Sequence, residues 1–177
     1  MRVRTEVSVP LPEKKNLYLA ATAPAMTFYG INTMFNICLV GSGAIAAQHM
    51  KAFCELGGVR PRYVESRTAD KAWEFAQKWQ FDRPEVELDV PLNDPAVNLV
   101  VITSPSEHHA EQTMRALRAG KDVIVEIPVA MNFADTERIV ELAARLGRRV
   151  LVCHTMRSDH FPLLRKSAGG CWKRICA

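Results

Sequence analysis

The residues most suggestive of chemistry form a short glycine loop, Gly41-x-Gly43-x-x-Ala46, directly after an apolar run at residues 35–40. A glycine at the first position permits a tight turn, the second lets a phosphate approach the backbone, and a small third residue lets a helix pack on the strand. The free N–H groups and positive dipole end of a helix starting near Ala44 would then meet phosphate oxygens. The pattern predicts a dinucleotide site; the alternative is a sharp turn that binds nothing.

A second group of polar residues, Glu65-Ser66-Arg67, follows the next expected strand at residues 62–66. In dinucleotide-binding units this point lies beside the adenosine ribose. A carboxylate there accepts hydrogen bonds from the ribose hydroxyls and repels a 2′-phosphate, whereas a hydroxyl and a guanidinium accommodate that phosphate. If Ser66 occupies the discriminating position NADP is favoured, and if Glu65 does NAD is favoured. We prefer NADP because an arginine follows; the alternative for Arg67 is an ordinary solvated charge.

The elements around these residues alternate between short apolar or β-branched runs and amphipathic helical patterns, which is typical of βαβ units. The pattern predicts an α/β fold, a doubly wound parallel sheet (Rossmann fold), in a single domain at residues 34–157. Strands are expected at 35–40, 62–66, 86–88, 98–103 (the central one), 122–126 and 149–154, and helices from 44, at 69–79, from the cap Ser106, and from the cap Asn132 to Gly147. In the first helix, Ile45 and His49 lie on the apolar stripe. In the last helix, Leu146 is expected to face inward. Residues 92–97 are expected to form a turn.

The two ends lack such patterns. Residues 1–33 are expected to be a disordered extension or a misassigned start ahead of Met34, although residues 14–25 faintly resemble a secretion signal. Residues 158–177 are expected to be an irregular tail or an out-of-frame ending. The formal charge of +4 comes from these two ends, so a basic nucleic-acid-binding face on the domain is disfavoured.

The cysteine usage and hydropathy bear on compartment and partners. The five cysteines are odd in number and form no C-x-x-C pair, which favours reduced thiols in a cytoplasmic protein. No cluster of metal ligands is evident in the sequence, so no metal is expected. No apolar run approaches the roughly 18 residues of a membrane span, so no membrane partner is expected either.

Several further motifs keep a specific order along the chain. They are Gly41-Ser42-Gly43-Ala44-Ile45-Ala46 with His49, Ser66-Arg67, Val101-Ile-Thr-Ser-Pro-Ser106 with His109-Ala-Glu111, Ala116-Leu-Arg-Ala-Gly-Lys121, and Val125-Glu-Ile-Pro128. Together they resemble the N-terminal half of the glucose-fructose oxidoreductase and inositol dehydrogenase family, Gfo/Idh/MocA, over about residues 35–157. That resemblance implies an NAD(P)-dependent oxidoreductase acting on a sugar, polyol or related carbonyl compound.

The same resemblance implies a set of cofactor contacts. The set begins with the glycine loop, Ala44 and Ile45, and continues with Ser66 and Arg67. Ser104, Pro105, Ser106 and His109 would lie along the cofactor, and Glu126, Ile127 and Pro128 would lie at its nicotinamide end. The alternative for His109 is an ordinary residue of a helix's first turn, and for Pro128 it is a strand terminator.

Two departures from the family affect the expected activity. The family usually has Glu-Lys-Pro where this chain has Glu126-Ile127-Pro128, and isoleucine can neither donate a proton nor a hydrogen bond. Either the machinery differs or the site is impaired, and no catalytic residue is identified. The family's second domain, which binds substrate, supplies a catalytic histidine and forms the homo-oligomer interface, has no counterpart after residue 157.

The leading expectation is therefore an NADP-binding domain that binds cofactor weakly and turns over no substrate alone. The alternatives are a truncated or frameshifted remnant, a non-catalytic dinucleotide-sensing module, or another Rossmann enzyme such as a homoserine dehydrogenase. Whether the chain is an enzyme by itself is left open.

Overall fold

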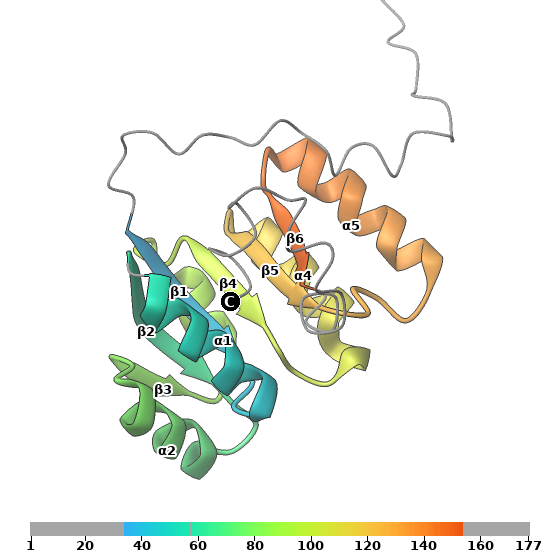
Figure 1. Cartoon of the computed structure of the whole chain (residues 1–177). Coiled ribbons are helices and arrows are strands. Elements are labelled where there is room, and N and C mark those ends of the chain that lie inside the picture. The colour runs from blue at the N-terminus through green and yellow to red at the C-terminus, as the bar shows by residue number, and fades with distance from the viewer. Residues whose placement is uncertain (1–33, 57, 154–177) are drawn as a thin grey trace, which may run out of the picture. The chain divides into compact units, whose positions relative to one another are not determined.

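A computed structural model describes residues 34–56 and 58–153, in which strands and helices alternate (Figure 1). The extension and tail predicted at the two ends lie outside these residues. The strands are β1 Phe35–Val40, β2 Val59–Glu65, β3 Arg83–Glu85, β4 Leu99–Ile102, β5 Asp122–Glu126 and β6 Val150–Cys153. The helices are α1 Ala44–Leu56, α2 Ala69–Trp79, α3 Asp89–Asn93, α4 His109–Arg118 and α5 Phe133–Leu146, with a 3-10 turn, η3, at Ser106–His108.

The strands form one parallel sheet of six in the order β3-β2-β1-β4-β5-β6. The chain moves outward from β1 to β3, then returns to the other side of β1 and moves outward from β4 to β6. The expected Rossmann fold is thereby confirmed, with β4 in the middle beside β1. Because all six carboxyl ends lie at one edge, the point between β1 and β4 where the order reverses is where such sheets bind ligands.

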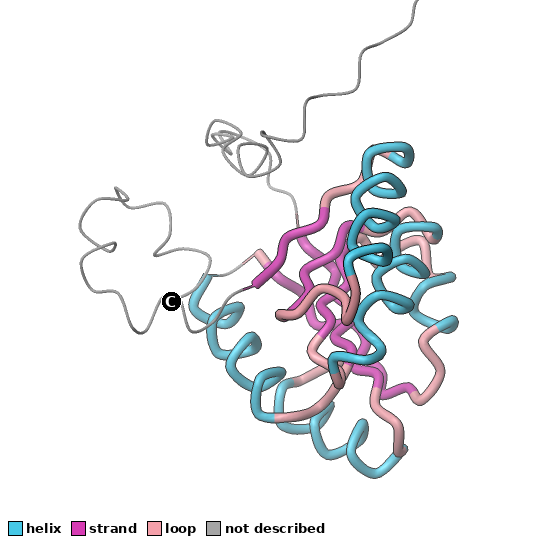
Figure 2. Tube along the Cα trace, turned by 90° about the vertical axis from the view of Figure 1, so that its right-hand side faces the viewer, coloured by secondary structure: helices cyan, strands magenta, loops and turns pink. Residues whose placement is uncertain are grey.

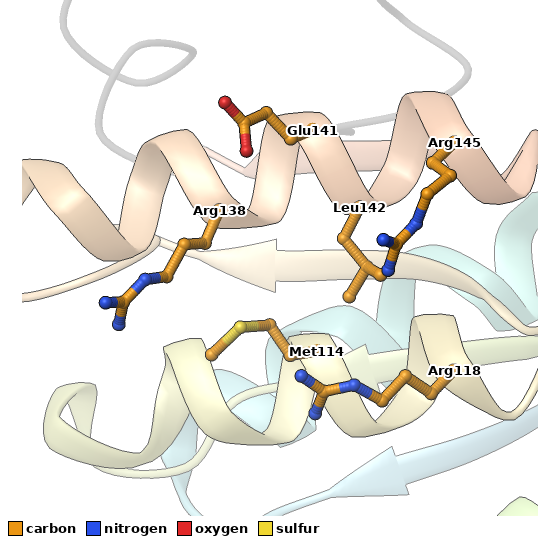
Figure 3. A pocket seen from close by; sticks show the side chains of 6 residues that line it. All are labelled: Met114, Arg118, Arg138, Glu141, Leu142 and Arg145. Carbon is orange, nitrogen blue, oxygen red and sulfur yellow. The ribbon is translucent and has the colours of Figure 1, made fainter.

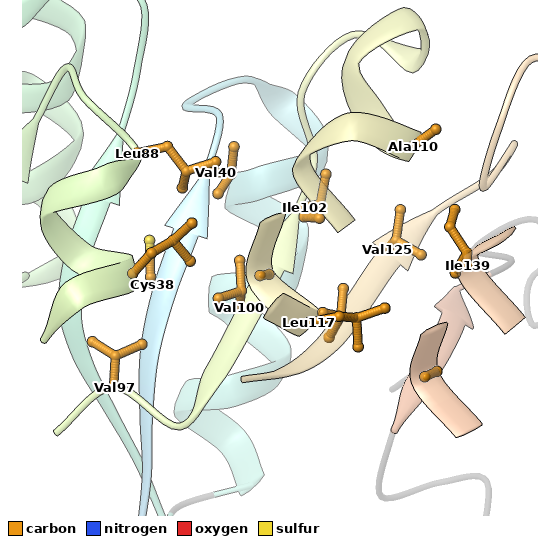
Figure 4. Packing of buried hydrophobic residues seen from close by; sticks show 14 of the residues in the cluster. Cys38, Val40, Leu88, Val97, Val100, Ile102, Ala110, Leu117, Val125 and Ile139 are labelled. Carbon is orange, nitrogen blue, oxygen red and sulfur yellow. The ribbon is translucent and has the colours of Figure 1, made fainter. Parts of the chain in front are cut away.

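Helices cover both faces of the sheet (Figure 2). On one face α1 and α2 pack on β1, β2 and β4, with Met50 and Phe75 among the buried contacts. On the other face α3, α4 and α5 pack on the strands, with Leu117 and Ile139 in the core (Figure 4). Burial of each large aliphatic side chain contributes about 1.5–3 kcal/mol, so these two cores hold the strand ends in place.

Strand boundaries differ from the sequence-based expectation on one side of the sheet. β2 begins at Val59 rather than 62, and its register with β1 shifts where Pro61 faces Ile37. β3 lies at Arg83–Glu85, not 86–88, and contains Pro84. Proline is tolerated in β3 because β3 is an edge strand. A proline in the sequence was therefore no reason to reject a strand at these residues. The predicted turn at 92–97 is partly the short helix α3.

Helix boundaries were predicted better than helix faces. Asn132 caps α5, because its side-chain oxygen accepts from the Asp135 N–H over 2.8 Å, and Gly147 ends the helix in the left-handed region. Leu146, expected to face inward, is 39% exposed, since it lies in the last turn where the helix leaves the sheet.

The buried face of α1 and the start of α4 also depart from expectation. In α1 the buried residues are Ala46 and Met50, whereas Ile45 is exposed. The close approach of the small Ala46 to the sheet determines which side of α1 faces inward. Ser106 begins η3 instead of capping a helix, and α4 starts at His109 without a side-chain cap.

No helix within the described residues has the length and apolar character needed to cross a membrane.

Candidate functional site

The loop between β1 and α1 brings backbone rather than side chains to the carboxyl edge of the sheet. Gly41 has a φ of +101°, and a Cβ atom at this position would lie 3.0 Å from the carbonyl carbon and oxygen of Thr103. Only glycine avoids both the strain and the close contact. A Cβ atom on Gly43, by contrast, would meet no protein atom within 4 Å. The fold requires the first glycine, whereas the second leaves open space beside the start of α1.

The end of β2 lies against this loop. The Gly41 N–H donates to the Glu65 carbonyl oxygen over 2.8 Å, and the hydroxyl oxygens of Ser42 and Ser66 are 2.9 Å apart. Ser66 is buried, while Arg67 is exposed and forms no ion pair with any residue in 34–56 or 58–153. The side chain that joins the glycine loop to β2 is therefore that of Ser66.

The carboxyl group of Glu65 has a different environment. Burial raises the pKa of Glu65, and the positive charges of Arg115 and His108 oppose that shift. Both of these residues belong to the η3–α4 segment after β4. The Glu65 carboxyl group is therefore less readily ionised than in water, and the charges of the η3–α4 segment offset part of that effect.

A pocket of about 930 Å³ joins the glycine loop to the end of β2, α2 and the residues after β4, a size suited to a small-molecule ligand. Seven predicted cofactor-binding residues line it: Gly41, Ser42, Gly43, Ser66, Arg67, Ser104 and Pro105. Glu65, the alternative considered for the ribose-side position, lines it as well. The sequence analysis did not identify the rest of the lining, which is Thr68, Lys71, Glu74, Phe75, Lys78, Thr103, His108 and Gln112.

Some of the residues that were missed carried a usable signal. Lys71, Glu74 and Lys78 share a stripe at helical spacing on α2, and the bounds of that helix were predicted correctly. This polar stripe borders the apolar face of α2, so the sequence could have been used to predict that it lies beside Arg67. Gln112 offered no such signal, because its role depends on a contact: the Ser104 hydroxyl donates to its side-chain oxygen over 2.5 Å.

The remaining predicted residues lie outside the lining of this pocket. Ala44 and Ile45 are exposed in the first turn of α1, and Ser106 is half-buried in η3. The others are His109, Glu126, Ile127 and Pro128.

His109 connects two loops at the edge of the sheet. Its Nε2 atom lies 2.7 Å from the Ser104 carbonyl oxygen, its Nδ1 atom lies 2.8 Å from the Pro128 carbonyl oxygen, and the residue is 1% exposed. A carbonyl oxygen accepts, so a ring nitrogen that bears a proton donates to the carbonyl oxygen beside it. His109 thereby ties the loop after β4 to the loop after β5.

The end of β5 combines a buried pair with an exposed apolar residue. The Glu126 Oε1 atom lies 2.7 Å from His49 Nε2, and both side chains are about nine-tenths buried. Ile127 is 39% exposed, and the peptide bond between it and Pro128 is cis. The exposed position at which the family resemblance implies a lysine therefore holds a side chain that has no proton to donate.

Lys121, at the end of the Ala116–Lys121 motif, is held inside the domain. Its Nζ atom donates to the carbonyl oxygens of Asp94 and Val97 over 2.7 and 2.9 Å. Burial lowers the pKa of Lys121, and the Asp94 charge opposes that shift. The lysine anchors the loop before β4 and does not reach the pocket.

A second, smaller hollow of about 320 Å³ lies between α4 and α5 (Figure 3). It is lined by Met114, Arg118, Arg138, Glu141, Leu142 and Arg145. Arg138 already pairs with Asp135 at 3.1 Å, and none of these residues comes from a strand end. The hollow is thus separate from the pocket at the glycine loop.

Comparison with known proteins agrees with this geometry. Residues 35–154 match the Gfo/Idh/MocA oxidoreductase family in its NAD-binding Rossmann fold. The chain is 34% identical over 121 residues to a 4-carboxy-2-hydroxymuconate-6-semialdehyde dehydrogenase from a Sphingobium strain, covering 68% of this chain and 38% of that protein. It is 35% identical over 120 residues to an inositol 2-dehydrogenase from Gluconacetobacter diazotrophicus, covering 65% of this chain and 35% of the relative.

A solved structure provides a further comparison. The 3-ketoreductase KijD10 from Actinomadura kijaniata, in complex with NADP and TDP-benzene, superposes with a TM-score of 0.66 at 28% identity. The match covers 76% of this chain and 41% of the reductase. The similarity thus extends over the described domain, and this chain spans well under half the length of each of these relatives.

Proposed function

The chain belongs to the Gfo/Idh/MocA oxidoreductase family, of which it contains the NAD(P)-binding domain, and from that premise we propose that the domain binds NADP(H) in preference to NAD(H). The whole protein is proposed to transfer hydride between this cofactor and a sugar, polyol or related carbonyl compound. The observation that carries the cofactor preference is the placement of Ser66 and Arg67 beside the glycine loop.

The pyrophosphate is proposed to lie over the glycine loop. The space that a Cβ atom of Gly43 would occupy is free of protein, so phosphate oxygens can approach the backbone there. The first N–H groups of α1 have no partners within the helix, and the helix dipole favours an anion at this end. No acidic side chain lies in the first turn of α1 to oppose it.

The adenosine 2′-phosphate is proposed to lie against Ser66 and Arg67. The buried Ser66 hydroxyl presents a neutral group where a carboxylate would repel the phosphate, and Arg67 is not engaged in an ion pair with any described residue. Lys71 and Lys78 line the same pocket and add positive charge. Glu65 and Glu74 oppose them, which is why the preference needs a direct test.

At the other end of the cofactor, Glu126, Ile127 and Pro128 are proposed to lie near the nicotinamide. The cofactor supplies the hydride chemistry when it is bound. The chain's own contribution is to hold the two loops that border this end, through the contacts of His109 with Ser104 and Pro128. Proton transfer to a substrate oxygen must come from a group other than Ile127.

Fluorescence titration with NADPH and NADH tests the proposal on the full chain. The wild-type chain should bind NADPH more tightly, and Arg67→Ala should weaken NADPH binding by about 10- to 100-fold, the worth of a charge-assisted hydrogen bond, with little effect on NADH. Arg145→Ala, in the separate hollow between α4 and α5, is the matched control. Tighter binding of NADH than of NADPH by the wild-type chain, or equal loss for both nucleotides in Arg67→Ala, would contradict the proposal.

A second candidate function, dinucleotide binding without turnover, is favoured by one observation: an apolar side chain, Ile127, is exposed at the position proposed to lie near the nicotinamide. The two candidates differ in whether bound NADPH is consumed. Loss of NADPH absorbance on addition of sugar or polyol-derived ketones favours the enzyme, and tight binding without any loss favours the module.

A further inference from the structure

The carboxyl edge of the sheet holds a second group of polar side chains beyond the glycine-loop pocket. His49 from α1, Glu126 at the end of β5 and Cys153 at the end of β6 each offer one ligand-type atom, and these atoms all lie within 4.8 Å of one another. All three side chains are buried. We propose that these residues form a zinc site.

The chemistry of the donors selects the ion. An imidazole nitrogen, a carboxylate oxygen and a thiolate sulfur are together typical of zinc, while a thiolate disfavours magnesium and calcium. With the thiol deprotonated, the two anionic ligands carry the charge that balances a divalent cation. This balance matters because a buried ion without compensating charge is strongly unfavourable.

The backbone places the three donors close to coordinating positions. Glu126 and Cys153 are register partners on the adjacent parallel strands β5 and β6, so their side chains leave the same face of the sheet side by side. His49 reaches them from α1, with its Nε2 atom 2.7 Å from Glu126 Oε1. Zinc lies about 2.0–2.3 Å from such ligands, which sets the donor atoms about 3.5 Å apart. On binding, the hydrogen-bonded His49–Glu126 pair would therefore separate by somewhat less than about 1 Å, and the widest donor distance would contract by roughly 1 Å.

Without zinc, the same groups form a hydrogen-bonded pair between His49 and Glu126. The metal would replace the proton shared by that pair and the proton of the Cys153 thiol. Three protein ligands leave the fourth position of a tetrahedral ion open, as in catalytic rather than structural zinc sites.

The site lies next to Ile127, and this position suggests a role for the zinc ion. That role rests on the proposed function. Glu126 directly precedes Ile127 at the end of the sheet proposed to hold the nicotinamide. A zinc ion there could polarise a substrate carbonyl as a Lewis acid, in the place of a hydrogen-bond donor that isoleucine cannot provide. The site itself is testable without nucleotide.

Titration of the metal-free full chain with Co²⁺, and competition for Zn²⁺ with a chromophoric chelator, test the site. We expect a thiolate-to-cobalt charge-transfer absorption in the wild-type chain that is absent in Cys153→Ser. The affinity for Zn²⁺ should fall in Cys153→Ser and in His49→Gln by more than the roughly 10- to 100-fold that accompanies loss of an outer-shell partner. Circular dichroism checks that both variants fold.

The other cysteines of the chain provide the controls. Cys54→Ser and the double variant Cys171→Ser/Cys176→Ser should keep both the absorption and the affinity. Absence of any cobalt absorption in the wild-type chain, retention of it in Cys153→Ser, or its loss in the double variant would each overturn the proposal. Nucleotide titrations are run separately, so failure of the zinc site and failure of NADP binding remain distinguishable.

Discussion

The two halves of the sheet organise their functional residues in different ways. In the half that begins at β1, the glycine loop and the end of β2 bring backbone and short side chains to the pocket close to two strand ends, and residues after β4 complete its lining. At the ends of β4 to β6, contacts between residues far apart in the chain hold the edge: His49 reaches Glu126 from α1 across 77 positions, and His109 meets Pro128 across 19. The first half has a site that a local motif specifies, and the second has one that only folding assembles.

The largest effect that would sharpen this comparison is expected at Gly41. Gly41→Ala places a Cβ atom against the Thr103 backbone at a positive φ, and should lower the free energy of unfolding by about 1–3 kcal/mol. Gly43→Ala is the control within the same loop: it should change stability by under about 0.5 kcal/mol while weakening NADPH binding. Urea unfolding and nucleotide titration measure both. Equal stability losses in the two variants would show that the fold does not depend on Gly41 more than on Gly43.

The next effect concerns the second half. His109→Leu removes the ring nitrogens that lie against the Ser104 and Pro128 carbonyl oxygens, and should cost about 2 kcal/mol of unfolding free energy. His108→Leu, one residue earlier and exposed, should cost little. If His109→Leu unfolds at the same urea concentration as the wild-type chain, the clamp between the two loops carries no stability.

A smaller effect compares a helix from each half. Asn132→Ala removes the side-chain cap of α5 and should cost about 1 kcal/mol. Thr68→Ala is its counterpart at the start of α2, where the side chain makes no cap hydrogen bond, and thermal unfolding should barely change. A larger loss at Thr68 than at Asn132 would contradict this difference between the helices.

The smallest effect is expected from Glu65, whose pKa is raised by burial. A raised pKa means that the folded chain binds this proton more tightly than the unfolded chain does, so the stabilisation is present below the unfolded pKa and is lost as pH rises through the folded pKa. Glu65→Gln should therefore raise the melting temperature slightly near pH 7, and the gain should vanish near pH 4. A gain that is unchanged between these pH values would show that it does not come from ionisation of Glu65.

Much of the architecture could be predicted from the sequence. The bounds of β1, α2 and β5 agree with expectation, because each depends on short-range periodicity and on a stop signal nearby. Prediction failed where the environment outweighed local preference: Pro84 is accepted in β3 because it lies at an edge, and Ile45 is exposed because Ala46 packs on the sheet.

The candidate site divides in the same way. The sequence motifs placed Gly41, Gly43 and Ser66 in one pocket, since they follow the ends of neighbouring parallel strands. They did not reveal that the Ala116–Lys121 motif ends in a buried anchor, with Lys121 bonded to the carbonyl oxygens of Asp94 and Val97. The partners of a long side chain are set by packing and are not encoded by neighbours in the chain.

The sequence by itself determined the parallel α/β fold, the turn that only glycine can make at residue 41, and the absence of a proton donor at Ile127, because residue type and near-neighbour spacing decide each of these. Only the tertiary structure decided that His109 links two loops and that His49, Glu126 and Cys153 converge. The physical reason is the sheet order: parallel pairing brings the carboxyl ends of β4, β5 and β6 to one edge, where side chains distant in the chain become neighbours.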